Sequence, residues 1–259
     1  MKTYALIAMV ALAPAGMFAE DADLAKKLSN PVADLISVPI QGNYDFEVGP
    51  EDGTRFTTNI QPVIPFALNE NWNVISRTIL PVIDVQGTLP GGAGDEFGLG
   101  DITQSFFFSP KQSDPIWGIG PVFLLPTATD DLLGGDKWGI GPTAVLLKQQ
   151  GHATYGALVN HIWDFAGDSD RPGVNATFLQ PFFAYTTPSA TTFTVNIESS
   201  YDWRENQWTV PVNLIVSQLT KIGGHPVQFF GGVRYYAEKP EDGPDWGLRF
   251  GVTFLFPKS

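Results

Sequence analysis

The chain contains no cysteine. Disulfide bonds, thiolate metal sites and a cysteine nucleophile are therefore excluded. Basic residues are also scarce, because 15 lysines and arginines stand against 27 aspartates and glutamates and give a net charge of −12. This balance argues against nucleic acid as a partner, since binding to phosphates requires a basic surface.

Long apolar runs are absent except for one near the start, over residues 4–13. Lys2 precedes this run and small residues follow it, which is the layout of a signal peptide cleaved after Ala15 or Ala19. A membrane-spanning helix is the competing interpretation, but it needs about 20 apolar residues, and a proline interrupts this run. We therefore expect residues 1–19 to be removed after export.

Glycine, proline and aromatic residues are abundant in the chain. From residue 36 onward, apolar and polar residues alternate in many segments. From Ile36 to Val48 the alternation has a period of two over the whole segment, which predicts a strand. Strands in soluble proteins are commonly five or six residues long, whereas a tilted strand needs about 9–11 residues to cross a bilayer. The length of this segment therefore favours a membrane-spanning strand.

The same pattern continues along the chain and predicts about twelve strands. They are expected near residues 36–48, 54–66, 72–85, 98–109, 116–126, 137–148, 153–164, 174–186, 192–202, 207–220, 225–238 and 246–256.

The predicted connections are of two kinds. Compact turns follow the even-numbered strands (67–71, 110–115, 149–152, 187–191 and 221–224), and longer acidic loops follow several odd-numbered ones (86–97, 127–136, 165–173 and 239–245). Short periplasmic turns and long outer loops are typical of outer-membrane barrels. The fold class is therefore all-β, a transmembrane antiparallel β-barrel over residues 36–259, preceded by a segment at 20–35. That segment is expected to be a short helix at the periplasmic mouth or in the lumen, or a disordered leader.

Charge predicts which face of each strand turns inward. In the last strand Arg249 shares one parity with glycines and a threonine, and the aromatic residues share the other. Because an arginine facing lipid at the middle of the bilayer costs about 2–4 kcal/mol, the arginine face should line the lumen. The residues expected to line the lumen are Asp45, Glu47, Arg55, Arg77, Glu198, Arg234 and Arg249. They could set a field across a narrow channel, or pair with one another and fill it.

Weak alternation and internal prolines fit this barrel poorly, whereas a repeated motif agrees with aromatic girdles at its two ends. Strands 72–85 and 98–109 alternate weakly, since Ile75 and Ile79 share the parity of Arg77. The motif WGIGP occurs twice, at 117–121 and 138–142, and should place its two tryptophans at opposite ends of the barrel. Prolines also lie inside predicted strands, although a closed barrel has no free edge for them, so bulges or strand ends must absorb them. They are Pro39, Pro62, Pro65, Pro81, Pro121, Pro142, Pro181 and Pro211.

Four segments resemble a known family. They are NPVADLISVPIQGNYDF (30–46), SRTILPVI (76–83), GLGDI (98–102) and WGLRFGVTFLFPK (246–258). Together they resemble the outer-membrane transporter family associated with meta-pathway phenol degradation, whose members are often mislabelled neuromedin U. The resemblance covers nearly the whole mature chain. It implies a barrel that passes small, aromatic or apolar solutes, and it carries over no catalytic or binding residues.

The three histidines, His152, His161 and His225, follow no metal-ligand spacing, and no GxSxG nucleophile motif accompanies them. The sequence thus predicts no catalytic residue, no metal site and no cofactor. We expect a passive transporter of small solutes in the bacterial outer membrane, with membrane lipid and lipopolysaccharide as its other partners. The alternatives are a plugged structural or surface-interaction barrel, an outer-membrane hydrolase, and a soluble secreted β-sandwich.

Overall fold

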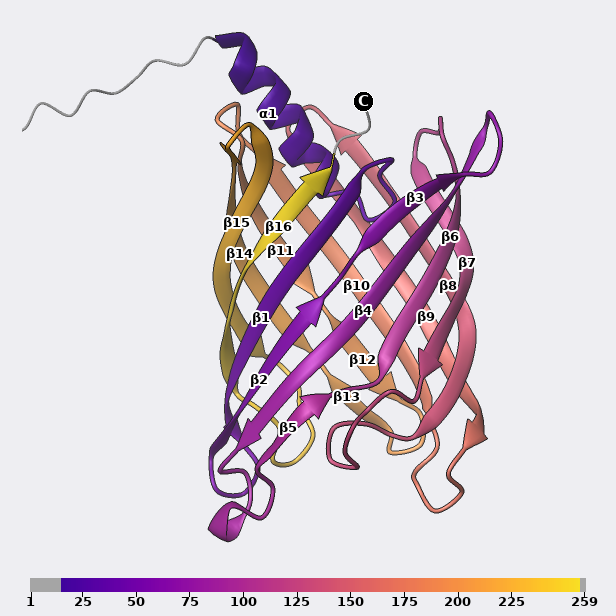
Figure 1. Cartoon of the computed structure of the whole chain (residues 1–259), viewed down its shortest axis with the longest axis vertical. Coiled ribbons are helices and arrows are strands. Elements are labelled where there is room, and N and C mark those ends of the chain that lie inside the picture. The colour runs from indigo at the N-terminus through magenta and orange to yellow at the C-terminus, as the bar shows by residue number, and fades with distance from the viewer. Residues whose placement is uncertain (1–14, 257–259) are drawn as a thin grey trace, which may run out of the picture.

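The computed structural model describes residues 15–256, and their side chains from residue 20 onward. It is a closed antiparallel barrel with a helix at one end (Figure 1). The elements are α1 (Ala15–Leu28), β1 (Ile36–Val48), β2 (Gly53–Ile60), β3 (Val63–Ala67), β4 (Trp72–Gln86), the 3-10 turn η1 (Pro90–Gly92), β5 (Glu96–Leu99), β6 (Ile102–Pro110), β7 (Ile116–Leu125), β8 (Lys137–Gln150), β9 (Ala153–Gly167), β10 (Asn175–Thr186), β11 (Thr191–Ile197), β12 (Ser199–Asp202), β13 (Gln207–Thr209), β14 (Pro211–Ile222), β15 (His225–Tyr236) and β16 (Trp246–Phe256).

These segments form twelve strands around the barrel, because four of the strands are interrupted. The pairs β2 and β3, β5 and β6, β11 and β12, and β13 and β14 each continue one strand across a short break. The first strand β1 pairs with the last strand β16, and β10 pairs with both β11 and β12, so the sheet has no free edge. The predicted twelve-stranded barrel is confirmed, and the β-sandwich is wrong because the sheet closes on itself.

Some of the prolines in the barrel wall lie at the breaks between strand segments. Pro62 lies in the break between β2 and β3, where its carbonyl still accepts a hydrogen bond from the Thr78 amide. Pro211 begins β14 directly after the break that follows β13. Because these breaks leave the pairing register unchanged, the two halves of each strand stay on the same neighbour.

A different irregularity separates β5 from β6. Leu99 of β5 pairs with Val82 of β4, and Thr103 of β6 pairs with Ile79 of β4. From the first pair to the second, the β5–β6 strand advances by four residues and β4 by three. This extra residue is a β-bulge, which shifts the side chains that follow onto the opposite face. It explains why residues 98–109 alternate poorly as a single strand.

The repeated WGIGP motif places two prolines opposite each other. Pro121 pairs with Pro142 across β7 and β8. Beside them the β6–β7 ladder passes from the Ser105–Val122 pair directly to Phe108–Ile119, and the β8–β9 ladder has a similar gap. Since proline has no amide hydrogen to donate, these gaps are its direct consequence.

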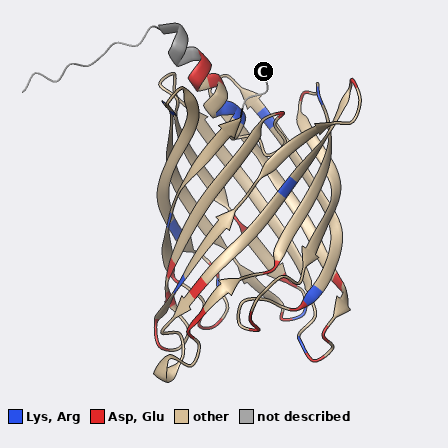
Figure 2. Ribbon diagram, in the orientation of Figure 1, with Lys and Arg blue, Asp and Glu red and all other residues tan. Residues whose placement is uncertain are grey.

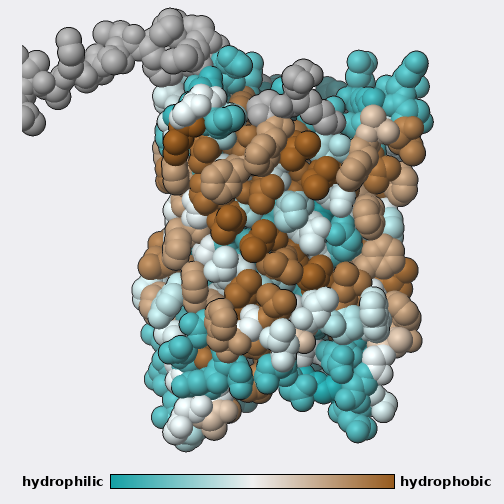
Figure 3. All heavy atoms as spheres, in the orientation of Figure 1, coloured by the Kyte–Doolittle hydropathy of each residue, from teal (hydrophilic) through white to brown (hydrophobic). Residues whose placement is uncertain are grey.

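The outer wall of the barrel is apolar and its ends are polar. A hydrophobic band crosses the middle of the face shown in Figure 3, with hydrophilic residues above and below it. Charged residues gather near the two ends, with few along the wall (Figure 2). On β16 the exposed residues are aromatic or aliphatic, such as Phe250, whereas Arg249 and Thr253 are buried inside. This is the pattern expected of strands that face lipid outside and a polar lumen inside.

The two ends of the barrel differ in their connections. The compact turns lie at the end that carries α1, and the longer loops lie at the opposite end (Figure 1). By the outer-membrane pattern, the α1 end is periplasmic. No helix within residues 15–256 is long and apolar enough to span a membrane. The expected signal peptide, residues 1–19, lies mostly outside the described residues.

Candidate functional site

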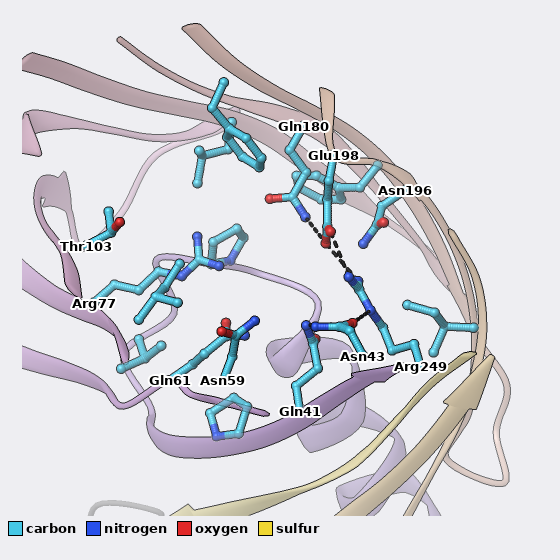
Figure 4. Close-up of a pocket in the computed structure, with 18 of the residues that line it drawn as sticks. Gln41, Asn43, Asn59, Gln61, Arg77, Thr103, Gln180, Asn196, Glu198 and Arg249 are labelled. Carbon is cyan, nitrogen blue, oxygen red and sulfur yellow. Dashed lines mark hydrogen bonds and ion pairs between the residues drawn. The ribbon is translucent and has the colours of Figure 1, made fainter. Parts of the chain in front are cut away.

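The barrel encloses a lumenal cavity of about 800 Å³. Its lining comes from strands all around the barrel and from the segment that follows α1 (Figure 4). The lining is divided. Charged and amide side chains gather on the wall formed by β1, β2, β11, β12, β15 and β16, and apolar side chains gather mostly on the wall formed by β4 to β10. The chemistry of the cavity follows from these two halves.

An ion pair spans the polar half. Arg249 on β16 donates from Nη1 and Nη2 to the two carboxylate oxygens of Glu198, each at 2.7 Å, and from Nε to Asn43 Oδ1 at 2.8 Å. Glu198 lies in the break between β11 and β12, and its amide donates to the Pro211 carbonyl. The paired forks of guanidinium and carboxylate give this contact both strength and fixed geometry.

A second cluster centres on Asp45 of β1, which is buried. Arg55 Nη2 lies 3.7 Å and Arg234 Nε 3.8 Å from its carboxylate oxygens. Tyr236 donates its hydroxyl hydrogen to Asp45 Oδ1 at 3.0 Å, and the Arg234 guanidinium lies 5.4 Å from the centre of the Tyr236 ring. One carboxylate therefore serves two guanidinium groups, which leaves positive charge in excess here.

Arg77 stands apart from both clusters. It extends into the cavity from β4, on the wall opposite Arg249 (Figure 4). No carboxylate of the described residues lies within the 4.0 Å ion-pair distance of its guanidinium. Its electrostatic partner is Glu198, across the lumen and beyond contact distance.

The structure places six of the seven expected lumen residues on this cavity and leaves one outside. Glu47 is exposed, because the chain forms a bulge there with a positive φ of 60° and Glu47 drops out of the ladder with β2. It lies at the outer rim beside Asp245. There the Lys239 ammonium, which pairs with Asp245, holds the pKa of that carboxyl below its ordinary value. Period-two counting cannot detect such a bulge.

The apolar half of the lumen was not expected from the sequence. Ile75 and Phe107 are fully buried inside the barrel, and with Val145, Leu147 and Leu158 they form one cluster. Val63, Phe178 and Phe182 pack against it. Hence Ile75 and Ile79 share the face of Arg77 because that face is itself largely apolar.

The segment between α1 and β1 lies in the periplasmic mouth and lines the cavity there. Val32 inserts into the apolar cluster of the lumen, and Ala25 and Leu35 pack against residues of β14 and β16 such as Leu219 and Leu255. Polar contacts hold α1 in place, since Lys221 Nζ lies 2.9 Å from Asp21 Oδ1 and Gln149 Nε2 donates to the Lys26 carbonyl at 3.0 Å. A helix at the mouth was one of the arrangements that the sequence left open.

Basic groups outnumber acidic ones along the cavity. Among the described residues its charged lining consists of Lys27, Arg55, Arg77, Arg234 and Arg249 against Asp45 and Glu198. The lumen is thus positive although the whole chain is strongly negative. Within residues 15–256, no three histidine, aspartate or glutamate side chains come close enough together to hold a metal ion.

The fold is similar to that of solved outer-membrane proteins. An outer membrane channel from Pseudomonas putida F1 matches with a TM-score of 0.65 at 15% identity, over 86% of this chain and 94% of that one. The outer membrane phospholipase of Salmonella typhi, a dimer with bound calcium, matches with a TM-score of 0.50 at 9% identity, over 90% of this chain and 96% of that one. At such identities the similarity concerns the fold alone. A search of curated proteins found no matching sequence.

A family model agrees with the resemblance seen in the sequence. Residues 36–259, the whole of the predicted barrel, match the model of the family described as "Putative MetA-pathway of phenol degradation". The match begins at the first residue of β1 and leaves out α1 and the segment between α1 and β1. The chain therefore belongs to this family of barrel proteins associated with phenol degradation.

Proposed function

We propose that the protein is an outer-membrane channel through which small, partly apolar solutes pass passively. The observation that carries this proposal is the lumenal cavity, which is of the size that small-molecule sites commonly have and has one apolar and one charged half. A barrel whose lumen served only for stability would favour an interior filled by its own side chains, as in eight-stranded barrels. The similarity to a solved outer-membrane channel and the family assignment support the same function.

Passage is proposed without covalent chemistry. His161, the histidine that an outer-membrane hydrolase would need near the outer rim, faces away from the lumen beside Trp163. Its Nδ1 contacts the hydroxyl of Thr177 rather than a carboxylate, so the serine–histidine–acid arrangement is not formed around it. We therefore favour a channel over a hydrolase.

A plugged barrel is the second candidate, and the segment at the periplasmic mouth favours it. Val32 lies in the lumen within a packed apolar cluster, so a solute can leave into the periplasm only past residues 29–35 or after their displacement. In a transporter this segment acts as a gate, whereas in a structural barrel it is a permanent plug.

Flux through reconstituted protein distinguishes the two candidates. The full mature chain and a variant lacking residues 20–33 are compared by liposome swelling and by conductance in planar bilayers. We expect solute-dependent flux through the full chain and a larger flux through the deletion variant. Flux through the deletion variant alone would favour the plug, and no flux through either would contradict transport.

Location and processing are proposed together. We propose that the chain is exported by its signal peptide and resides in the outer membrane, with its apolar belt against lipid and lipopolysaccharide. A heat-modifiability gel of outer-membrane fractions tests the location, since a folded barrel migrates differently before and after boiling. The intact mass of the purified protein distinguishes cleavage after Ala15 from cleavage after Ala19.

A further inference from the structure

Arg77 differs from the other arginines that line the cavity, because no carboxylate of the described residues lies within ion-pair distance of it. All three donor nitrogens of Arg249 are bound to Glu198 and Asn43. Arg55 and Arg234 share the carboxylate of Asp45. Arg77 reaches into the same cavity with no carboxylate of the described residues in contact. An ionisable side chain that faces a cavity at membrane depth is a candidate functional residue, and Arg77 is placed in this way.

The surroundings of Arg77 are largely apolar. Ile75 and Ile79 precede and follow it on the same face of β4, and its direct neighbours across the ladder are Val63 of β3 and the polar Ser105 of β6. Val63, Phe178 and Phe182 pack against the buried cluster that contains Ile75. The guanidinium thus lies at the border between an apolar wall and the open part of the cavity.

The charge opposite Arg77 does not repel an anion strongly. Glu198 faces it across the lumen, but both of its carboxylate oxygens are bound by Arg249. The remaining charge along the lining is positive in excess, because Asp45 is shared by two arginines. An anion entering the cavity therefore meets a favourable field.

We propose that Arg77 binds the carboxylate of a small amphiphilic acid, whose apolar part lies against the wall of Val63, Ile79 and Phe178. The planar fork of a guanidinium matches a carboxylate and holds it by two parallel hydrogen bonds. The cavity of about 800 Å³ admits a molecule with a single ring or a short branched chain. This inference rests on the proposed function and narrows its solute class to acids.

The probes are benzoate and benzyl alcohol, which have similar shape but differ in charge. Binding to the full mature chain in lipid nanodiscs is measured by titration calorimetry, with empty nanodiscs subtracted. Arg77→Gln is compared with the control Arg55→Gln, which removes the same charge from the same lumen. Arg77→Lys keeps the charge without the fork. Heat-modifiability shows that each variant is folded.

We expect benzoate to bind more tightly than benzyl alcohol. Arg77→Gln should weaken benzoate binding at least tenfold, and Arg77→Lys should weaken it less. Arg55→Gln removes one charge of the field but no contact with the carboxylate, so it should weaken binding several times less than Arg77→Gln does. Neither glutamine variant should affect benzyl alcohol. Equal losses in Arg77→Gln and Arg55→Gln would show a diffuse field and overturn the site, as would benzoate binding that is absent or insensitive to Arg77.

The two proposals fail in different ways. Binding is measured at equilibrium and does not require passage. A barrel that binds benzoate at Arg77 but shows no solute flux keeps the site and refutes the channel. A barrel that passes solutes but binds no benzoate at Arg77 keeps the channel and refutes the site.

Discussion

Glu198 and Arg249 form a doubly hydrogen-bonded ion pair across a chord of the lumen, with two strands, β14 and β15, between their own positions in the barrel wall. The two residues lie on strands that are not neighbours, so the pair depends on the curvature of the wall, which turns their inner faces toward each other. It ties the last strand to the interrupted strand β11–β12. The side chain of Arg249 is only 2% exposed, which makes it dependent on its partner.

Removing Glu198 should therefore destabilise the barrel. We expect Glu198→Gln to lower the free energy of unfolding by about 2–3 kcal/mol, because Arg249 loses two charge-assisted hydrogen bonds. Urea unfolding in phospholipid vesicles measures this change. Glu70→Gln is the control, since Glu70 is exposed in a periplasmic turn. Equal stability of the two variants would contradict a structural role for the pair.

Phe107 and Phe108 test which face of β6 is packed. Phe107 is fully buried in the lumen cluster, whereas Phe108 is 40% exposed on the outer wall. We expect Phe107→Ala to cost about 3–5 kcal/mol, because it leaves a cavity among side chains that cannot collapse. Phe108→Ala should cost less, since acyl chains fill the space. The temperature at which each variant loses its folded gel mobility compares them, and the reverse order would refute the packed lumen.

The two faces of the wall should respond differently to a new charge. Phe250 lies near the middle of β16 and faces outward, and Gln41 of β1 pairs with the next residue and faces the cavity. Phe250→Arg should lower the free energy of unfolding by about 2–4 kcal/mol, as expected for arginine facing lipid at the middle of the bilayer. Gln41→Arg should change it by less than about 1 kcal/mol. Folding titrations in vesicles measure both changes. Similar losses of unfolding free energy in the two variants would show that the faces are wrongly assigned.

The contact between Asp21 and Lys221 should hold the mouth of the barrel closed. Partly exposed ion pairs contribute at most about 1 kcal/mol, so Asp21→Asn should raise the fraction of time spent open by up to about fivefold. Single-channel recording measures that fraction. Asp23→Asn makes the same charge change at an exposed position of α1 and should leave gating unchanged. Identical traces from both variants would show that the contact between Asp21 and Lys221 does not hold α1 in place.

Sequence reasoning located the strands well because their signal is local. A strand between lipid and a polar lumen must alternate, and charge then identifies the inner face, as it does for Arg249. Interruptions of that alternation were harder to interpret. The bulges at Glu47 and between β5 and β6 each add one residue to one strand, and nothing in a period-two count marks where the extra residue lies.

The number of strands, their order and, away from the bulges, the faces they present follow from the sequence alone, because they depend on neighbouring residues and on the cost of placing charge in lipid. The contacts between inward groups depend on the three-dimensional fold: Glu198 meets Arg249, Asp45 meets two arginines, and Val32 meets the apolar wall. Closure of the barrel brings together inner faces that are distant along the chain. The same arrangement places no carboxylate beside Arg77, which extends into the cavity.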